Sequence, residues 1–200
     1  MLSKAQLLEP LARLRTNEVV VTTMSVVRPW AQYSDHDLDF ASADSAMGHT
    51  ADLALGIALA QPSRTVICLN GDGSMLMSLG TLATIVASGA SNLVLFVIDN
   101  GTYEITGNQP VPGAGHLDFV AMAQAAGFQR TYGFDDPNAY EAALPGLLQG
   151  GGPVFACIRV ELGTEGPISR SNAEEARYLK ISLADWSQQF RTALLNDTPS

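Results

Sequence analysis

The residues with the clearest chemical potential are the four at positions 71–74, Gly-Asp-Gly-Ser. They follow an aliphatic run at 66–69 that is typical of a buried strand, and they precede a segment with helical character. Ligands bind at such junctions in open α/β sheets, because the free N–H groups at a helix N-terminus attract anions. The two glycines let the backbone turn sharply and approach a ligand closely. This segment is therefore the first candidate binding site.

Asp72 lies in a stretch of chain without basic residues. None of the 11 Lys and Arg falls within residues 65–129, whose only acids are Asp72, Asp99, Glu104 and Asp118. A carboxylate in such surroundings is costly unless a cation satisfies it. We therefore expect Asp72 to bind a metal ion.

Further ligands for this metal are expected after the next strand. The predicted helix at 75–88 descends about 21 Å at 1.5 Å per residue, and the predicted strand at 93–98 rises about 20 Å at 3.3 Å per residue. Asp99 and Asn100 thus reach the same sheet edge as Asp72. Carboxylate, amide and carbonyl oxygens suit Mg²⁺ or Ca²⁺, and Mg²⁺ completes its shell with phosphate and water oxygens. The spacing predicts a metal–diphosphate site.

Strands and helices alternate along the chain. The expected strands cover 18–22, 65–69, 93–98 and 154–160, with a weaker one near 129–132, and the helices between them cover 49–60, 75–88, 117–126 and 138–149. Continuous apolar strands that alternate with helices indicate an α/β fold: a doubly wound, mostly parallel sheet with helices on both faces.

Two further helices are expected outside this unit. The first covers 3–14, with Ser3 and Gln6 as a capping box, and the last follows Ser182 and carries an apolar stripe. We therefore divide the chain into an N-terminal helix (1–16), a ligand-binding α/β domain (17–160), and a linker with a C-terminal helix (161–200).

Composition excludes several classes of protein. The net charge of −9 and the pI near 4.6 argue against nucleic acid as a partner, because phosphate contacts need clustered Lys and Arg. No apolar run is long enough to span a membrane, and residues 1–16 do not resemble a secretory signal. Cys68 and Cys157 lie inside apolar runs, which favours buried thiols over a disulfide. We expect a cytoplasmic protein that assembles with other subunits.

Segment 71–74, together with Asn100 placed 28 positions after Asp72, resembles the diphosphate-binding motif of thiamine-diphosphate enzymes. A longer match is similar to the cofactor-binding subunit or C-terminal domain of sulfopyruvate and phosphonopyruvate decarboxylases; it covers residues 71–79, 82–85, 99–104 and 106–110. Residues 44–49, Asp-Ser-Ala-Met-Gly-His, resemble the Gly-Ser-Met-Gly-His segment of the same group. The resemblance extends over roughly residues 17–160 and implies the thiamine-diphosphate-binding fold.

The resemblance also implies a site for thiamine diphosphate and Mg²⁺. Its metal ligands would be the Asp72 carboxylate, the Asn100 side chain and the Thr102 carbonyl. Around the metal, Gly71, Gly73 and Ser74 would form the turn and donate hydrogen bonds to the diphosphate.

Upstream of this motif, the resemblance implies that Met47, followed by Gly48, props the cofactor in its bent form. Read alone, Met47 would more often fill a core. The Ser45 carbonyl would accept from the 4′-amino group, and Thr23 would be a further phosphate donor. Met24 departs from the family pattern, because relatives usually carry Gly at that position.

Two residues are candidates for catalysis. His49 either serves the substrate or starts a helix, and Glu104 is either a surface charge or a polar group over the reacting centre.

A complete enzyme of this family also needs a pyrimidine-binding domain, whose Glu activates the cofactor. With 200 residues the chain holds one α/β unit, so the resemblance implies a separate partner subunit in a hetero-oligomer. The expected activity is non-oxidative decarboxylation of a small 2-oxo acid that resembles sulfopyruvate or phosphonopyruvate. An acetolactate-synthase-type carboligase subunit and a non-catalytic cofactor-binding subunit are the alternatives.

Overall fold

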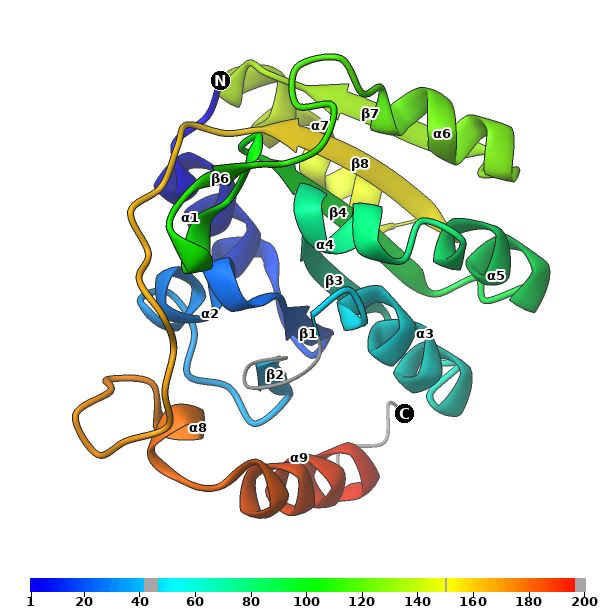
Figure 1. The fold of residues 1–200 in the computed structure, drawn as a ribbon. Coiled ribbons are helices and arrows are strands. Elements are labelled where there is room, and N and C mark those ends of the chain that lie inside the picture. Colours follow the sequence, from blue (N-terminus) through cyan, green and yellow to red (C-terminus); the bar gives the residue numbers. More distant parts are fainter. Residues whose placement is uncertain (42–46, 150, 197–200) are drawn as a thin grey trace.

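The computed structural model describes residues 1–41, 47–149 and 151–196. Its centre is a six-stranded sheet in the order β2-β1-β3-β4-β8-β7, and every strand pair in this sheet is parallel (Figure 1). A small antiparallel pair, β5 with β6, lies apart from it. The predicted doubly wound α/β fold is confirmed.

The strands are β1 (Val19–Thr22), β2 (Asp39–Ala41), β3 (Val66–Gly71), β4 (Leu93–Asp99), β5 (Thr102–Tyr103), β6 (Gln109–Pro110), β7 (Arg130–Phe134) and β8 (Val154–Arg159). The helices are α1 (Lys4–Leu14), α2 (Met24–Ala31), α3 (Thr50–Ala60), α4 (Asp72–Met77), α5 (Thr81–Ser88), α6 (Phe119–Ala126), α7 (Pro137–Leu148), α8 (Arg177–Lys180) and α9 (Leu183–Asn196), with a short 3-10 turn, η1, at Glu104–Thr106. Among the helices of the described residues, none is long and apolar enough to cross a membrane.

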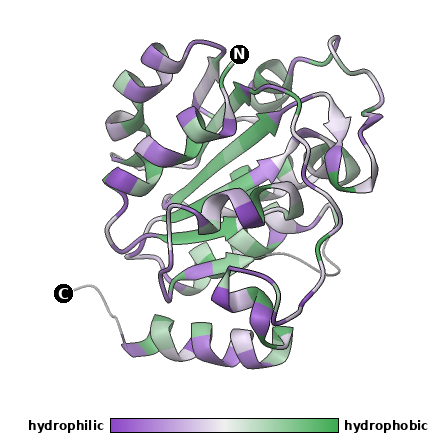
Figure 2. Cartoon of the chain, turned by 90° about the vertical axis from the view of Figure 1, so that its left-hand side faces the viewer, coloured by the Kyte–Doolittle hydropathy of each residue, from purple (hydrophilic) through white to green (hydrophobic). Residues whose placement is uncertain are grey.

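Alternating side chains of the strands build two hydrophobic layers, because successive residues of a strand point to opposite faces of the sheet. In β3, Val66 and Cys68 join the layer under α3 to α6, whereas Ile67 and Leu69 join the layer under α1, α2 and α7. Buried apolar side chains make up both layers, and the central strands are accordingly hydrophobic on both faces (Figure 2). Cys68 and Cys157 are free and buried, as predicted.

The two terminal helices pack on their own chain. Ser3 is the N-cap of helix α1 and forms the predicted capping box with Gln6. Leu2, just before it, pairs with Val160, which directly follows β8. Near the other end, Trp186 and Phe190 of α9 are buried, the former among residues of α2, β2 and α8. The apolar stripe of α9 therefore covers this chain's own sheet edge and α2.

One predicted element was wrong in extent. The helix expected at 75–88 is two helices, α4 and α5, that are separated by a turn at Ser78–Gly80. Glycine is a poor helix former, and here Gly80 stands at the N-cap of α5. The sequence reading also missed α2, β2 and α8, which are short and lack a clear periodic pattern.

Candidate functional site

The site forms where the strand order reverses. Strands β2 and β3 lie on opposite sides of β1, so the carboxyl ends of β1 and β3 flank a crevice, the usual ligand position in open α/β sheets. Strand β4 lies next to β3, with Gly71 paired to Ile98. This register places Asp72 level with Asp99, and Asn100 follows at the same edge, as the element lengths predicted.

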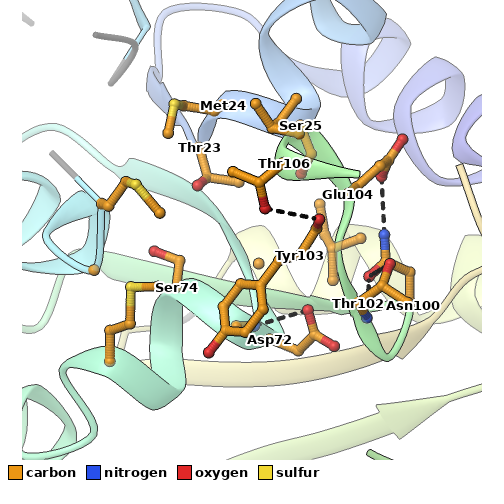
Figure 3. A pocket seen from close by; sticks show the side chains of 17 residues that line it. Thr23, Met24, Ser25, Asp72, Ser74, Asn100, Thr102, Tyr103, Glu104 and Thr106 are labelled. Atoms are coloured by element: carbon orange, nitrogen blue, oxygen red, sulfur yellow. Dashed lines mark hydrogen bonds between the residues drawn. The ribbon is translucent and has the colours of Figure 1, made fainter. Parts of the chain in front are cut away.

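A cavity of about 70 Å³, open to solvent, occupies this crevice (Figure 3). It is lined by the ends of β1, β3 and β4, the start of α4, and the loop through η1. The lining residues are Thr23, Met24, Ser25, Met47, Gly48, Gly71, Asp72, Gly73, Ser74, Met77, Ile98, Asn100, Thr102, Tyr103, Glu104, Ile105 and Thr106.

Asp72 is buried at the base of the cavity, with only 3% of its surface exposed. Its Oδ1 accepts a hydrogen bond from the Gly73 N–H at 2.8 Å, and its Oδ2 accepts one from the Gly101 N–H at 2.8 Å. Burial raises the pKa of Asp72 to about 7, and the neighbouring Asp99 carboxylate adds to the rise. Among the ion pairs of the described residues, none includes Asp72.

These surroundings fit a divalent cation. Each Asp72 oxygen keeps a lone pair beyond its one backbone hydrogen bond, and the charge lacks a basic partner. The described residues contain no cluster of three or more His, Cys, Asp or Glu that could hold a metal. A site with one carboxylate plus amide and carbonyl oxygens, completed by phosphate and water, matches the coordination of Mg²⁺.

Two hydroxyl groups of the cavity fit a phosphate. The Ser74 Oγ is buried without a hydrogen-bond partner in the structure, although it lies at the first turn of α4. Thr23 is the N-cap of α2, yet its side chain makes no capping hydrogen bond. Both side chains line the cavity (Figure 3), so a phosphate there would satisfy donors that the protein leaves unused.

Close backbone contacts around the cavity explain its glycines. A Cβ on Gly73 would overlap the ring of Tyr103, and Gly48, with φ of +82°, packs against Met77. Only glycine, which has no Cβ, permits the close packing at positions 48 and 73, and it also readily adopts the left-handed backbone conformation found at position 48.

The segment before α3 is placed only in part. Ser45 lies outside the described residues. Met47 lines the cavity with 47% of its surface exposed, and Met77 faces the same opening at 48%. His49 is the N-cap residue of α3 and does not line the cavity; its Nδ1 lies 2.6 Å from Asp52 Oδ2. Asp52 in turn accepts a hydrogen bond from the Thr81 hydroxyl.

Glu104 is not a surface charge, because its side chain is 1% exposed. Its carboxylate oxygens accept hydrogen bonds from Lys4 Nζ at 2.7 and 2.9 Å, from Asn100 Nδ2 at 2.9 Å and from the Glu165 N–H at 2.9 Å. The sequence did not predict the contact with Lys4, because Lys4 lies 100 residues before Glu104 and belongs to no recognised site motif. Ser25, Tyr103 and Met77 also line the cavity but were not singled out from the sequence, although Tyr103 and Met77 lie within the matched segments 99–104 and 71–79.

Comparisons with known proteins bear on this cavity. The family model described as thiamine pyrophosphate enzyme, C-terminal TPP binding domain, matches residues 22–158. The chain is 38% identical over 138 residues to sulfopyruvate decarboxylase subunit beta from Methanothermobacter thermautotrophicus, and the match covers 68% of this chain and 71% of that protein. It is 34% identical over 156 residues to phosphonopyruvate decarboxylase from Streptomyces hygroscopicus, covering 78% of this chain.

The match covers only 38% of that Streptomyces protein, so the chain spans about two fifths of its length. Among solved structures, the thiamine diphosphate-dependent 4-hydroxybenzoylformate decarboxylase of Rhodococcus jostii RHA1 superposes with a TM-score of 0.68 at 23% identity. That superposition covers 82% of this chain and 33% of the other. At this identity the likeness shows a shared fold.

Proposed function

The chain belongs to the thiamine pyrophosphate enzymes, whose C-terminal cofactor-binding domain it contains, and from this premise we propose that it is the diphosphate-binding half of a 2-oxo acid decarboxylase. The observation that carries the proposal is the buried Asp72 carboxylate, which faces a solvent-open cavity without a basic partner. Mg²⁺ and a diphosphate together would satisfy this charge and the unused Ser74 hydroxyl.

Each residue has a distinct part in this proposal. Asp72, the Asn100 side chain and the Thr102 carbonyl hold Mg²⁺, while Ser74 and Thr23 hydrogen-bond to the diphosphate. Because Gly73 N–H already donates to Asp72, its contribution is to orient the metal ligand.

Bound thiamine diphosphate supplies an electron sink for the carbanion left by decarboxylation. The chain's own residues bind it and orient it. Met47, at the cavity wall, supports the ring system as the family resemblance implies. His49, held by Asp52 just outside the cavity, is the candidate group for a proton near the substrate.

A second polypeptide completes the site in our proposal. Met47 and Met77 expose about half of their surfaces at the cavity opening. Apolar side chains that are exposed in this way are consistent with an opening that another subunit covers. The name of one relative, sulfopyruvate decarboxylase subunit beta, describes one component of a multi-subunit enzyme. We propose that the partner binds the pyrimidine ring and contributes the activating Glu.

The substrate in this proposal is a small 2-oxo acid with a second acid group, such as a sulfonate or phosphonate. In the part of the chain that the structure describes, no Lys or Arg lines the cavity. The partner therefore supplies the positive charge that such an acid group requires.

Calorimetric titration of the chain with thiamine diphosphate tests the cofactor site. We expect binding that depends on Mg²⁺ in the wild type and is lost in Asp72→Asn, because the neutral amide removes the metal's charge partner. Asp135→Asn, an exposed acid outside this cavity, is the matched control and should bind normally. Unchanged Mg²⁺-dependent affinity in Asp72→Asn would exclude the proposed metal site.

The partner and reaction need a separate assay. The chain is mixed with a candidate pyrimidine-binding subunit, Mg²⁺, cofactor and a panel of 2-oxo acids, and released CO₂ and aldehyde are measured. Stoichiometric aldehyde supports decarboxylation, whereas a condensed 2-hydroxy-3-oxo acid would point to a carboligase. Full activity from this chain alone would contradict the need for a partner.

A further inference from the structure

We propose that Glu104 is a positioning residue that, pinned by Lys4, fixes which end of the Asn100 side-chain amide faces the metal. The inference rests on the proposed function and adds to it a role for the N-terminal helix. It starts from the four hydrogen bonds that the buried Glu104 carboxylate accepts.

The Asn100 carboxamide can bind Mg²⁺ only through its oxygen, because the amide nitrogen has no lone pair to donate. Both ends of this amide are held. Its Nδ2 donates to Glu104 Oε2 at 2.9 Å, and its Oδ1 accepts from the Thr102 N–H at 3.0 Å (Figure 3). A flip of the amide would place two acceptors, Asn100 Oδ1 and Glu104 Oε2, against each other. The contact therefore selects the orientation that keeps the oxygen on the side of Thr102, whose carbonyl is the other proposed ligand.

Glu104 is itself held in place by contacts other than the one with Asn100. Lys4 Nζ contacts both carboxylate oxygens, and the Glu165 N–H donates to Oε1. Gly163 packs so closely on the carboxylate that a Cβ there would overlap it. Since Glu104 makes all these contacts at once, it cannot turn toward the reacting centre without leaving a buried charge unpaired.

Lys4 connects this amide to the start of the chain. It is the first residue of α1, and its ammonium group also donates to the Ser25 carbonyl in the first turn of α2 at 3.0 Å. The side chain of Lys4 is only 16% exposed, so solvent screens the pair with Glu104 weakly. Helix α1 thereby braces the loop that carries Asn100 and Thr102.

The test measures binding of Mn²⁺, a spectroscopic substitute for Mg²⁺, to the full chain at saturating thiamine diphosphate, with free Mn²⁺ counted by electron paramagnetic resonance. In Glu104→Ala the amide loses its acceptor, and we expect the metal dissociation constant to rise by about 10-fold or more, as for other residues that orient metal ligands.

A matched control separates this effect from general loosening. Glu174 forms an ion pair with Arg28 at 2.7 Å, the same length as the Lys4–Glu104 pair but more exposed to solvent. This pair holds the segment that follows β8 and does not touch Asn100. Glu174→Ala should lower the melting temperature while changing metal affinity less than about twofold. Equal losses of metal affinity in Glu104→Ala and Glu174→Ala would overturn the proposal.

A double-mutant cycle tests orientation itself. Asp at position 100 presents an oxygen in either rotamer, so it needs no group to select one end. In the Asn100→Asp background, Glu104→Ala should therefore cost no metal affinity, and removal of the like charge should improve it. The same loss in both backgrounds would show that Glu104 acts only through stability of the loop.

A second variant and the wild-type measurement keep this inference testable apart from protein folding and apart from the proposed function. Should Glu104→Ala fail to fold, Lys4→Met/Glu104→Met removes both charges together, which spares the fold an unpaired buried charge, and the same rise in the dissociation constant is expected. Absence of Mn²⁺ binding in the wild type would instead contradict the proposed function, whereas wild-type binding with unaltered Glu104→Ala affinity would contradict only this inference.

Discussion

At the scale of single residues, the cavity is defined by polar groups that the folded chain leaves incompletely satisfied. Buried hydroxyl and carboxylate groups are costly without partners, and natural proteins keep few of them. Ser74 is such a group, because its buried Oγ has no hydrogen-bond partner. Asp72, two residues earlier, keeps a buried carboxylate that accepts two backbone hydrogen bonds but has no basic partner. A ligand that binds these groups would remove the free-energy cost of burying them, which explains why the protein keeps them.

Ser74→Ala follows from this reasoning. Loss of the hydroxyl should weaken thiamine diphosphate binding by about 10- to 100-fold, the range for one hydrogen bond to a charged group. It should not destabilise the free protein, because the buried Oγ has no partner there. Calorimetry and thermal melting of the same samples check both. A lowered melting temperature in the absence of ligand would mean that the hydroxyl has a structural partner.

At the scale of elements, the site depends on how closely α4 approaches the β5 strand. Helix α4 begins at Asp72 directly after β3 and ends at Met77, so the turn before α5 redirects the chain. Gly73 permits Tyr103 of β5 to pack on the first turn of α4. The loop with Asn100 and Thr102 is positioned by this contact as well as by Glu104.

Gly73→Ala should therefore disturb the site by steric overlap with the Tyr103 ring. We expect a loss of about 1–3 kcal/mol in the free energy of unfolding, the range for overpacked positions. Tyr103→Ala in the same chain should relieve most of the effect, because it removes the overlapping ring. Denaturant unfolding of the single and double variants measures these changes in the free energy of unfolding. If the losses of stability from the two substitutions were additive, the strain in Gly73→Ala would not come from the Tyr103 ring.

Helix α9 provides a second element-scale prediction. Trp186 is 1% exposed, its Nε1 donates to the Asp39 carbonyl at 3.1 Å, and its ring contacts Tyr178. Trp186→Ala should lower the free energy of unfolding by about 3–5 kcal/mol, as for other buried aromatic residues. Gln189→Ala, on the exposed face of α9, should change it by less than about 0.5 kcal/mol. Similar effects from both variants would show that α9 does not pack as described.

At the scale of the whole molecule, the N-terminal helix α1 packs over one face of the central sheet and the C-terminal helix α9 packs along its β2 edge. The segment after β8 runs along the outside past α2 to α8 and α9 (Figure 1). Arg28 holds this segment through Glu174 and through the carbonyls of Gly166 and Pro167. The same segment reaches Glu104 through the Glu165 N–H. The segment after β8 is therefore linked by a hydrogen bond to the loop that carries Glu104 at the cavity.

The Arg28–Glu174 pair makes stability depend on pH in a defined direction. The hydrogen bond from Arg28 holds the pKa of Glu174 below its ordinary value of 4.5. This contribution is therefore present above the ordinary pKa and is lost as the pH falls through the lower, folded-state pKa. Wild type should exceed Glu174→Gln in stability by at most about 1 kcal/mol at pH 7, since the pair is partly exposed. Thermal melting of both proteins from pH 7 to pH 3 should show the difference shrink; a difference that grows toward acid pH would contradict it.

The sequence by itself determined the alternation of the main strands and helices and the edge at which the ligand site forms. Apolar strands broken by Gly and Pro define a parallel sheet, and the lengths of elements between Asp72 and Asn100 place both at one edge, because rise per residue is a local property. Local geometry also accounts for the capping box at Ser3.

The tertiary structure decided which distant side chains meet at that edge. Lys4 and Glu104 are 100 residues apart and carry no shared motif, so only the packing of α1 against α2 and α7 brings them together. The break between α4 and α5 is a local feature that was also not predicted, although Gly80 in the turn is a poor helix former. Contacts between elements depend on how layers pack in space, and a one-dimensional pattern does not encode that packing residue by residue.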